Sequence, residues 1–184
     1  MKELLRGLNI YLIGMMGAGK TTVGKLLAEK LEYRFLDTDA IIEGVSQKTI
    51  NQIFTEEGEA SFRQWETKVL NEISPYLRTV VATGGGIILR QENWAYLRDG
   101  MIIYLDVAIA TLVNRLKEDN NRPLLLAEDL ETKLKQLQQE RESLYQQADI
   151  TITIGEKDTP EEIVMKILEA IPQKIKPKIN PEWN

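Results

Sequence analysis

The stretch NIYLIGMMGAGKTTVGKLLAEKL, residues 9–31, places a glycine-rich loop between an apolar run and a helical pattern. The loop fits the motif G-x-x-x-x-G-K-[S/T] in full, through Gly14, Gly17, Gly19, Lys20 and Thr21. In this motif backbone N–H groups converge on phosphate oxygens, the lysine reaches the β- and γ-phosphates, and the hydroxyl can ligate Mg²⁺. A glycine-rich turn with a solvated lysine is the alternative. The strand pattern before the loop and the helix pattern after it favour a nucleoside triphosphate site.

Composition limits the remaining classes of function. The 184 residues, 43% of them hydrophobic and 28% charged, are typical of one soluble globular domain. The net charge of −5 argues against a nucleic-acid or membrane-surface partner, which would require a basic face. No apolar run approaches the ~20 residues that cross a bilayer, and the first strand-like run begins too early for a signal peptide. We therefore expect a cytoplasmic protein. Because the chain has no cysteine or histidine, a general base must be a carboxylate, a lysine, a tyrosine or water.

Alternating patterns along the chain indicate the fold class. Five short apolar or β-branched runs predict strands at residues 9–14, 33–37, 79–84, 101–107 and 149–154. Most are nearly continuous rather than alternating, which is typical of parallel strands covered on both faces. Helical patterns lie between them, at residues 20–32, 59–73, 129–147 and 159–171. Strands that alternate with helices favour an α/β fold with a mainly parallel sheet.

Two stretches interrupt this alternation. KEDNNRPLLLAED, residues 117–129, is polar at first and centred on Arg-Pro, so we interpret it as a mobile loop or lid. Residues 172–184 contain three prolines and no periodicity, and we expect a flexible tail there. The sequence thus predicts a single domain over residues 1–171.

Two aspartates follow the second predicted strand, in LDTD at residues 36–39. The carboxyl edge of an open α/β sheet is where ligands bind, so Asp37 could hold Mg²⁺ through water and Asp39 could accept a hydroxyl proton. Either residue could instead simply cap the helix that follows.

Two further motifs are ambiguous when taken singly. Arg63 and Glu66 are i, i+3 partners on a predicted helix, and a surface ion pair would explain them equally well. Residues 84–86, GGG, could form a flexible turn or bring backbone close to a small ligand. The phosphate loop does not by itself distinguish a kinase from a GTPase or a motor protein, but the base-reading N-K-x-D motif of GTPases is absent from the sequence.

Taken together, six motifs resemble the shikimate kinase family: the phosphate loop, D-T-D, F-R-x-x-E, G-G-G, R-P-L-L and R-x-x-L-Y, in that order over residues 9–170. The resemblance implies transfer of the γ-phosphoryl group of ATP to the 3-hydroxyl of shikimate, towards chorismate and the aromatic amino acids. It also implies a five-stranded parallel sheet flanked by helices, as in nucleoside monophosphate kinases. The substrate-binding region would be residues 38–64 and the lid residues 116–128.

The resemblance also assigns roles to residues. Asp39, Lys20 and Arg122 would be catalytic. Glu66 would orient Arg63, and Mg²⁺ would be held by Thr21 and, through water, by Asp37. The residues expected to contact ATP are Gly17, Ala18, Gly19, Lys20, Thr21, Thr22, Arg115, Arg122 and Pro160. Those expected to contact shikimate are Asp39, Arg63, Gly84, Gly85, Gly86 and Arg141.

We expect the protein to be a monomer whose partners are the small molecules shikimate and ATP. Two other hypotheses of function compete with this one. The first is a different small-molecule kinase of the same fold, such as a gluconate or nucleotide kinase. The second is a non-catalytic, kinase-like binding protein, which the loss of Asp39, Arg63 or Arg141 would have favoured; all three are present.

Overall fold

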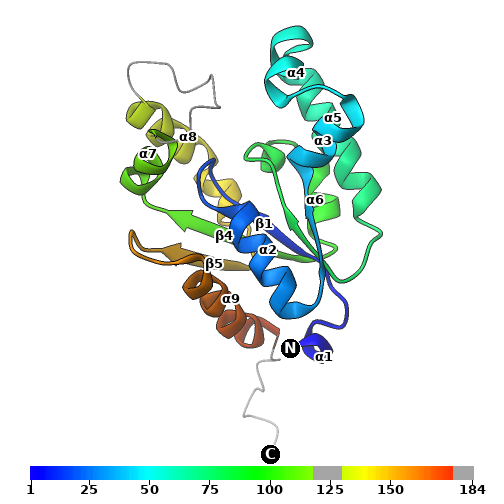
Figure 1. The fold of residues 1–184 in the computed structure, drawn as a ribbon, viewed down its shortest axis with the longest axis vertical. Coiled ribbons are helices and arrows are strands. Elements are labelled where there is room, and N and C mark those ends of the chain that lie inside the picture. The colour runs from blue at the N-terminus through cyan, green and yellow to red at the C-terminus, as the bar shows by residue number, and fades with distance from the viewer. Residues whose placement is uncertain (118–129, 176–184) are drawn as a thin grey trace, which may run out of the picture.

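The protein, described here from a computed structural model of residues 1–117 and 130–175, is built on a parallel β-sheet (Figure 1). Its strands lie in the order β2-β3-β1-β4-β5, and every neighbouring pair is parallel. Their bounds are β1 Ile10–Ile13, β2 Arg34–Asp37, β3 Thr79–Ala82, β4 Met101–Val107 and β5 Ile150–Ile154. The five strands and their parallel arrangement confirm the predicted fold class.

Helices cover both faces of this sheet. Their bounds are α1 Lys2–Leu5, α2 Lys20–Leu31, α3 Thr38–Ser46, α4 Ile50–Glu56, α5 Gly58–Ile73, the 3₁₀ turn η1 Ile87–Leu89, α6 Gln91–Leu97, α7 Ile109–Lys117, α8 Leu130–Tyr145 and α9 Pro160–Ile175. Helices α2 and α9 pack side by side in front of the sheet in Figure 1, whereas α8 lies behind it. Tyr145 of α8 stacks on Tyr104 of β4, with 4.5 Å between the ring centroids.

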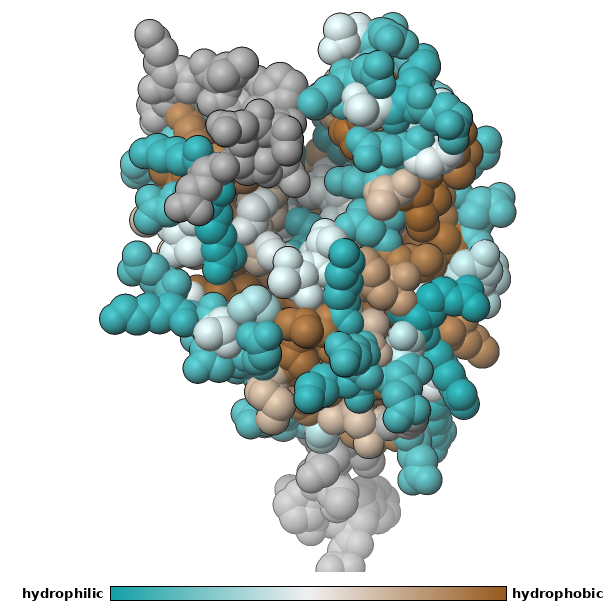
Figure 2. Space-filling view, in the orientation of Figure 1, coloured by the Kyte–Doolittle hydropathy of each residue, from teal (hydrophilic) through white to brown (hydrophobic). Residues whose placement is uncertain are grey.

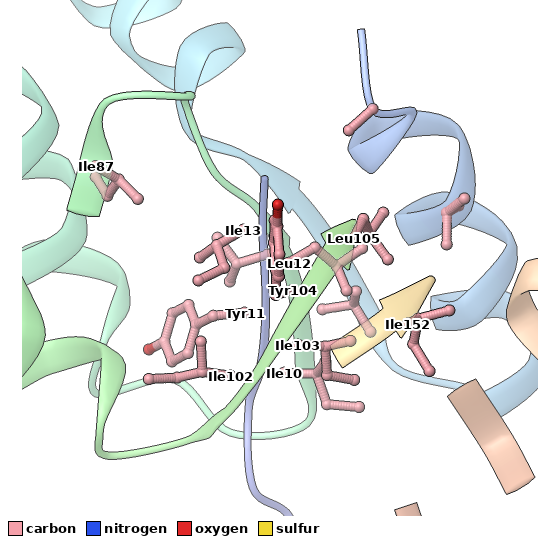
Figure 3. Close-up of a cluster of buried hydrophobic side chains, with 14 of the residues drawn as sticks. Ile10, Tyr11, Leu12, Ile13, Ile87, Ile102, Ile103, Tyr104, Leu105 and Ile152 are labelled. Atoms are coloured by element: carbon pink, nitrogen blue, oxygen red, sulfur yellow. The ribbon is translucent and has the colours of Figure 1, made fainter. Parts of the chain in front are cut away.

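The central strand explains why the sheet could be predicted. All four residues of β1 are fully buried, because β3 and β4 flank the strand and helices cover both of its faces. Figure 3 shows Leu12 and Ile13 of β1 among side chains of β4, including Leu105. The edge strand β5 alternates instead, with buried isoleucines and exposed threonines, as expected of a strand covered on one face.

The last helix begins where the sequence predicts and ends later. Thr159 and Glu162 form reciprocal side-chain-to-backbone hydrogen bonds of 3.2 and 2.8 Å, which cap α9. The helix then continues through Pro172 to Ile175, beyond the boundary expected for a tail, because Ile171 is buried in the core and Ile175 packs against it. Residues 176–184 lie outside the described residues, as does nearly all of the segment interpreted as a lid. No helix in the described part of the chain is long and apolar enough to cross a membrane.

Candidate active site

The phosphate loop joins the buried end of β1 to the first turn of α2. Gly14, Gly17 and Gly19 have φ angles of 149°, 78° and 91°, which residues other than glycine rarely adopt. A Cβ at Gly14 would also stand 2.8 Å from the carbonyl oxygen of Leu105. Gly19 is the N-cap residue of α2 and supplies no side-chain cap, so the first N–H groups of the helix are open to a ligand.

Lys20 folds back across this loop. Its Nζ donates hydrogen bonds to the carbonyl oxygens of Gly14, at 2.8 Å, and Met15, at 2.9 Å. The ammonium group is therefore held over the loop by neutral acceptors. Phosphate oxygens would be charged acceptors at the same place, and such hydrogen bonds are about twice as strong as neutral ones.

Thr21 and Asp37 meet beside the loop. Thr21 Oγ1 donates a 2.7 Å hydrogen bond to Asp37 Oδ2, while Asp37 Oδ1 accepts from the backbone N–H groups of Asp39 and Ala40. Asp37 is thus both a helix cap and a partner of the loop hydroxyl. A hydroxyl and a carboxylate are oxygen ligands that suit Mg²⁺. Within the described ranges, no cluster of three or more acidic, histidine or cysteine side chains is placed to hold a metal. This pair therefore fits an ion that takes its other ligands from phosphates and water.

Four other residues were expected to contact ATP: Thr22, Arg115, Arg122 and Pro160. Arg115 of α7 lies against the loop, since its Nη1 donates to the carbonyl oxygens of Gly17 (3.2 Å) and Ala18 (3.5 Å). Thr22 is the exposed third residue of α2, and Pro160 is the first residue of α9. Arg122 lies outside the described residues.

A cavity of about 340 Å³ opens next to the phosphate loop. It is formed by α3, α4, α5, α8, the loop that follows β3 and Met16 of the phosphate loop. All six residues expected to contact the substrate line it: Asp39, Arg63, Gly84, Gly85, Gly86 and Arg141. Met16 of the phosphate loop also lines the cavity. Its backbone nitrogen lies 3.7 Å from the point where a Cβ would stand at Gly85. The cavity and the phosphate loop are therefore adjacent.

Two hydrogen bonds fix the glycine loop against its neighbours. The N–H of Gly84 donates to Thr38 Oγ1 at 2.9 Å, and Arg141 Nη1 donates to the carbonyl oxygen of Gly85 at 3.0 Å. Thr38 is fully buried and is the central residue of the D-T-D motif. This role of Thr38 was not predicted from the sequence, although its position between the two aspartates was the available signal.

Glu66 is a buried carboxyl group whose pKa is strongly raised. Its side chain is 0% exposed, and its Oε2 accepts a 2.7 Å hydrogen bond from Arg63 Nη1. Burial raises the pKa of Glu66 to about 7, and the nearby charge of Asp39 acts in the same direction, whereas Arg63 and Arg141 oppose the shift. Complete burial contradicts the surface ion pair that was considered for Arg63 and Glu66.

Asp39 and Glu66 converge on Gly84. A Cβ at Gly84 would stand 2.6 Å from Asp39 Oδ1 and 2.7 Å from Glu66 Oε1, so only a glycine fits between them. The second oxygen of Glu66, Oε1, is buried and has no hydrogen-bond partner among the described residues. Asp39 therefore lines the cavity beside the guanidinium groups of Arg63 and Arg141, whereas Glu66 is buried next to Gly84.

Part of the cavity lining is apolar, and none of the sequence motifs predicted these residues as part of the site. Phe54 and Phe62 lie there with 4.7 Å between their ring centroids. Both rings line the cavity, and Phe62 is only 4% exposed. In Figure 2 the outer surface over α4 is mostly hydrophilic. The helical pattern of residues 59–73 gave no indication that Phe62 would face a ligand. Glu59 and Lys133 also line the cavity, and the remaining lining residues are Ile50, Leu130, Leu134 and Leu137.

This arrangement suits phosphoryl transfer to a small anionic acceptor. The phosphate loop would hold a triphosphate, the arginines would bind an acidic group, and a carboxylate lies where a hydroxyl could meet the γ-phosphate. The apolar wall would cover a hydrocarbon face of the acceptor.

Comparisons with known proteins agree with this chemistry. A family model for shikimate kinase matches residues 16–172. The chain is 56% identical to shikimate kinase of Rippkaea orientalis, over 97% of this chain and 95% of the relative, and 53% identical to that of Nostoc punctiforme, over 97% and 98%. A solved structure of Acinetobacter baumannii shikimate kinase in complex with shikimate superposes with a TM-score of 0.88 at 42% identity, covering 94% of this chain and 97% of that chain.

More distant structures share the fold alone. A gluconokinase from Sinorhizobium meliloti has a TM-score of 0.59 at 20% identity, covering 91% of this chain and 93% of its own. This likeness gives no support to gluconate as the substrate.

Proposed function

The chain belongs to the shikimate kinase family, and we infer that it is an enzyme that transfers the γ-phosphoryl group of ATP to the 3-hydroxyl of shikimate. The product would be shikimate 3-phosphate, on the route to chorismate and the aromatic amino acids. The observation that carries this assignment is the cavity beside the phosphate loop. It is lined by every residue that the sequence assigned to shikimate, and these residues come from four separate segments of the chain.

The phosphate loop would hold ATP. The N–H groups from Gly17 to Thr22 face the triphosphate in this proposal, and Lys20 exchanges its loop carbonyls for the β- and γ-phosphates. Arg115 is held against the loop and would flank the adenine, with Pro160 on the other side. Arg122 is predicted to supply a second positive charge at the phosphates of ATP.

Thr21 and Asp37 would hold Mg²⁺, Thr21 directly and Asp37 through water. The bound ion would offset the negative charge of the phosphates. The existing hydrogen bond between Thr21 Oγ1 and Asp37 Oδ2 keeps both oxygens at the place where they would be needed.

Arg63 and Arg141 would bind the carboxylate of shikimate. Both line the cavity, one from α5 and one from α8, so their guanidinium groups approach an acidic group from different directions. Glu66 orients Arg63 through the 2.7 Å hydrogen bond to Nη1. Gly84, Gly85 and Gly86 would lie beside the ring of shikimate. A Cβ at Gly84 would collide with Asp39 and Glu66, and one at Gly86 with Arg63, so these glycines keep the acidic and basic groups in place.

Asp39 would accept the proton of the 3-hydroxyl. As that proton moves to the carboxylate, the hydroxyl oxygen forms its bond to the γ-phosphorus, and the bond from phosphorus to the β–γ bridging oxygen breaks to release ADP. In a chain with no histidine, a carboxylate is one of the few groups that can serve as the base.

A coupled ADP-release assay tests this function against its rivals. Wild-type protein with ATP and Mg²⁺ should release ADP rapidly with shikimate, and only at the background rate with gluconate or nucleoside monophosphates. Lys20→Ala serves as the inactive control. Turnover with gluconate or a nucleotide but not shikimate would identify a different kinase, and no turnover with any acceptor would favour a binding protein.

A further inference from the structure

Arg63 is engaged by two carboxylates of its own helix. Glu59, four residues earlier, accepts hydrogen bonds from Nε at 3.2 Å and from Nη2 at 2.8 Å through its Oε1. Glu66, three residues later, accepts from Nη1 at 2.7 Å. A guanidinium group offers parallel N–H pairs for bidentate binding on its Nε edge and on its Nη1–Nη2 edge. In Arg63 each of these edges already bonds at least one carboxylate.

The two partners differ in how easily they can leave. The side chain of Glu59 is 63% exposed, so its carboxylate can return to water at little cost. Glu66 is 0% exposed, and losing Arg63 would leave a buried carboxylate without its main counter-charge. An incoming acidic group would therefore take the place of Glu59 and leave Glu66 bonded.

The position of Glu59 allows this exchange. Glu59 and Arg63 line the same cavity, and the Arg63 side chain is only 15% exposed. A Cβ at Gly86 would overlap the guanidinium group, so the group lies directly against the glycine backbone. It therefore has little freedom to turn away and meet a second carboxylate elsewhere.

We propose that Glu59 competes with the substrate carboxylate for Arg63, so that shikimate binds by displacing it. This inference rests on the proposed function, because it takes shikimate as the acidic ligand. Glu59 then acts as an internal competitor that weakens substrate affinity, in contrast to Glu66, which supports Arg63 in both states.

Calorimetric titration of shikimate into wild type, Glu59→Gln and Glu56→Gln tests the proposal. Glu56 is a matched control: its side chain is 53% exposed, three residues away, and pairs with Lys48, which also retains Glu57. Removing a competing surface ion pair should tighten shikimate binding by roughly two- to fivefold in Glu59→Gln. Glu56→Gln should bind like wild type. The methyl ester of shikimate, which has no carboxylate, should bind Glu59→Gln and wild type equally.

Unchanged or weaker shikimate binding in Glu59→Gln would overturn the proposal. Equal tightening in both variants would also overturn it, because it would indicate a general effect of charge rather than displacement at Arg63. A failure of the proposed function looks different: wild type would then bind neither shikimate nor its ester. Melting temperatures of the two variants confirm that the folded state is retained.

Discussion

Arg141 Nη1 donates a 3.0 Å hydrogen bond to the carbonyl oxygen of Gly85, which ties α8 to the glycine loop that follows β3. The arginine is 8% exposed, although it lies on a helix whose exposed positions are largely polar. Its side chain also lines the cavity. One side chain therefore positions the loop and presents charge to the ligand.

Replacing Arg141 with lysine should weaken shikimate binding. The single ammonium group of lysine cannot supply the planar donors that serve both the loop and a carboxylate. Loss of one charged hydrogen bond, about 1.5–3 kcal/mol, predicts a dissociation constant raised by roughly one to two orders of magnitude. Calorimetry with shikimate checks this. ATP affinity should stay the same, and so should shikimate affinity in the exposed control Arg98→Lys. An unchanged shikimate constant in Arg141→Lys would remove this residue from the site.

The Asp39→Asn variant should bind ATP normally and lose phosphoryl transfer, because an amide cannot accept the hydroxyl proton. A base contributes typically about 10²–10⁴-fold to a rate, so single-turnover transfer should slow by about that factor. Single-turnover quench measurements with saturating substrates provide the test. Transfer at the wild-type rate would show that Asp39 is not the base.

Gly86 should be intolerant of a single methyl group. Its φ of −103° is open to any residue, so alanine brings no backbone strain, but the new Cβ would overlap the Arg63 guanidinium. Displacing that group should raise the shikimate dissociation constant by roughly tenfold or more, the value of one charged hydrogen bond. Gly44→Ala is the matched control, since nothing lies within 4 Å of its Cβ position. Similar shikimate affinities in both variants would contradict the proposed place of Arg63.

Glu66 should make stability depend on pH in a characteristic window. Its pKa is about 7 in the folded protein against 4.5 for the ordinary side chain. Between these values the folded state keeps a proton that the unfolded state has lost, so the contribution of Glu66 to stability falls as pH rises. Glu66→Gln lacks this titration.

Urea unfolding of wild type and Glu66→Gln from about pH 5 to about pH 8 measures this contribution. The free energy of unfolding of wild type minus that of the variant should decrease up to about pH 7 and then level off. A difference that does not change with pH would mean that Glu66 is ionised throughout the range.

The elements that carry local signals could be predicted from the sequence. The continuous apolar pattern of β1 identified a buried parallel strand, and the helical pattern of residues 159–171 predicted the start of α9. The end of α9 could not be placed, because Pro172 suggests a break while the burial of Ile171 depends on the whole fold. Pro172 therefore lies within the helix.

The same holds for the site: some contacts follow from sequence spacing, and others depend on packing. The spacing of Arg63 and Glu66 predicts their contact. The pKa of Glu66 is raised chiefly by burial, and charges on other helices, Asp39 and Arg141, contribute less. The role of Glu59 at Arg63 also needed the structure, since i, i−4 spacing alone describes many solvated ion pairs. Sequence motifs named the groups, and packing decided which of them are buried together.

The position of phosphorylation is the most direct test of the central claim. The product of wild-type protein, ATP, Mg²⁺ and shikimate should be examined by phosphorus–proton correlation NMR. The account predicts one product, in which the phosphorus couples to the proton on ring carbon 3 of shikimate. Coupling to another ring position, or the absence of any phosphorylated shikimate while ATP is consumed, would contradict it.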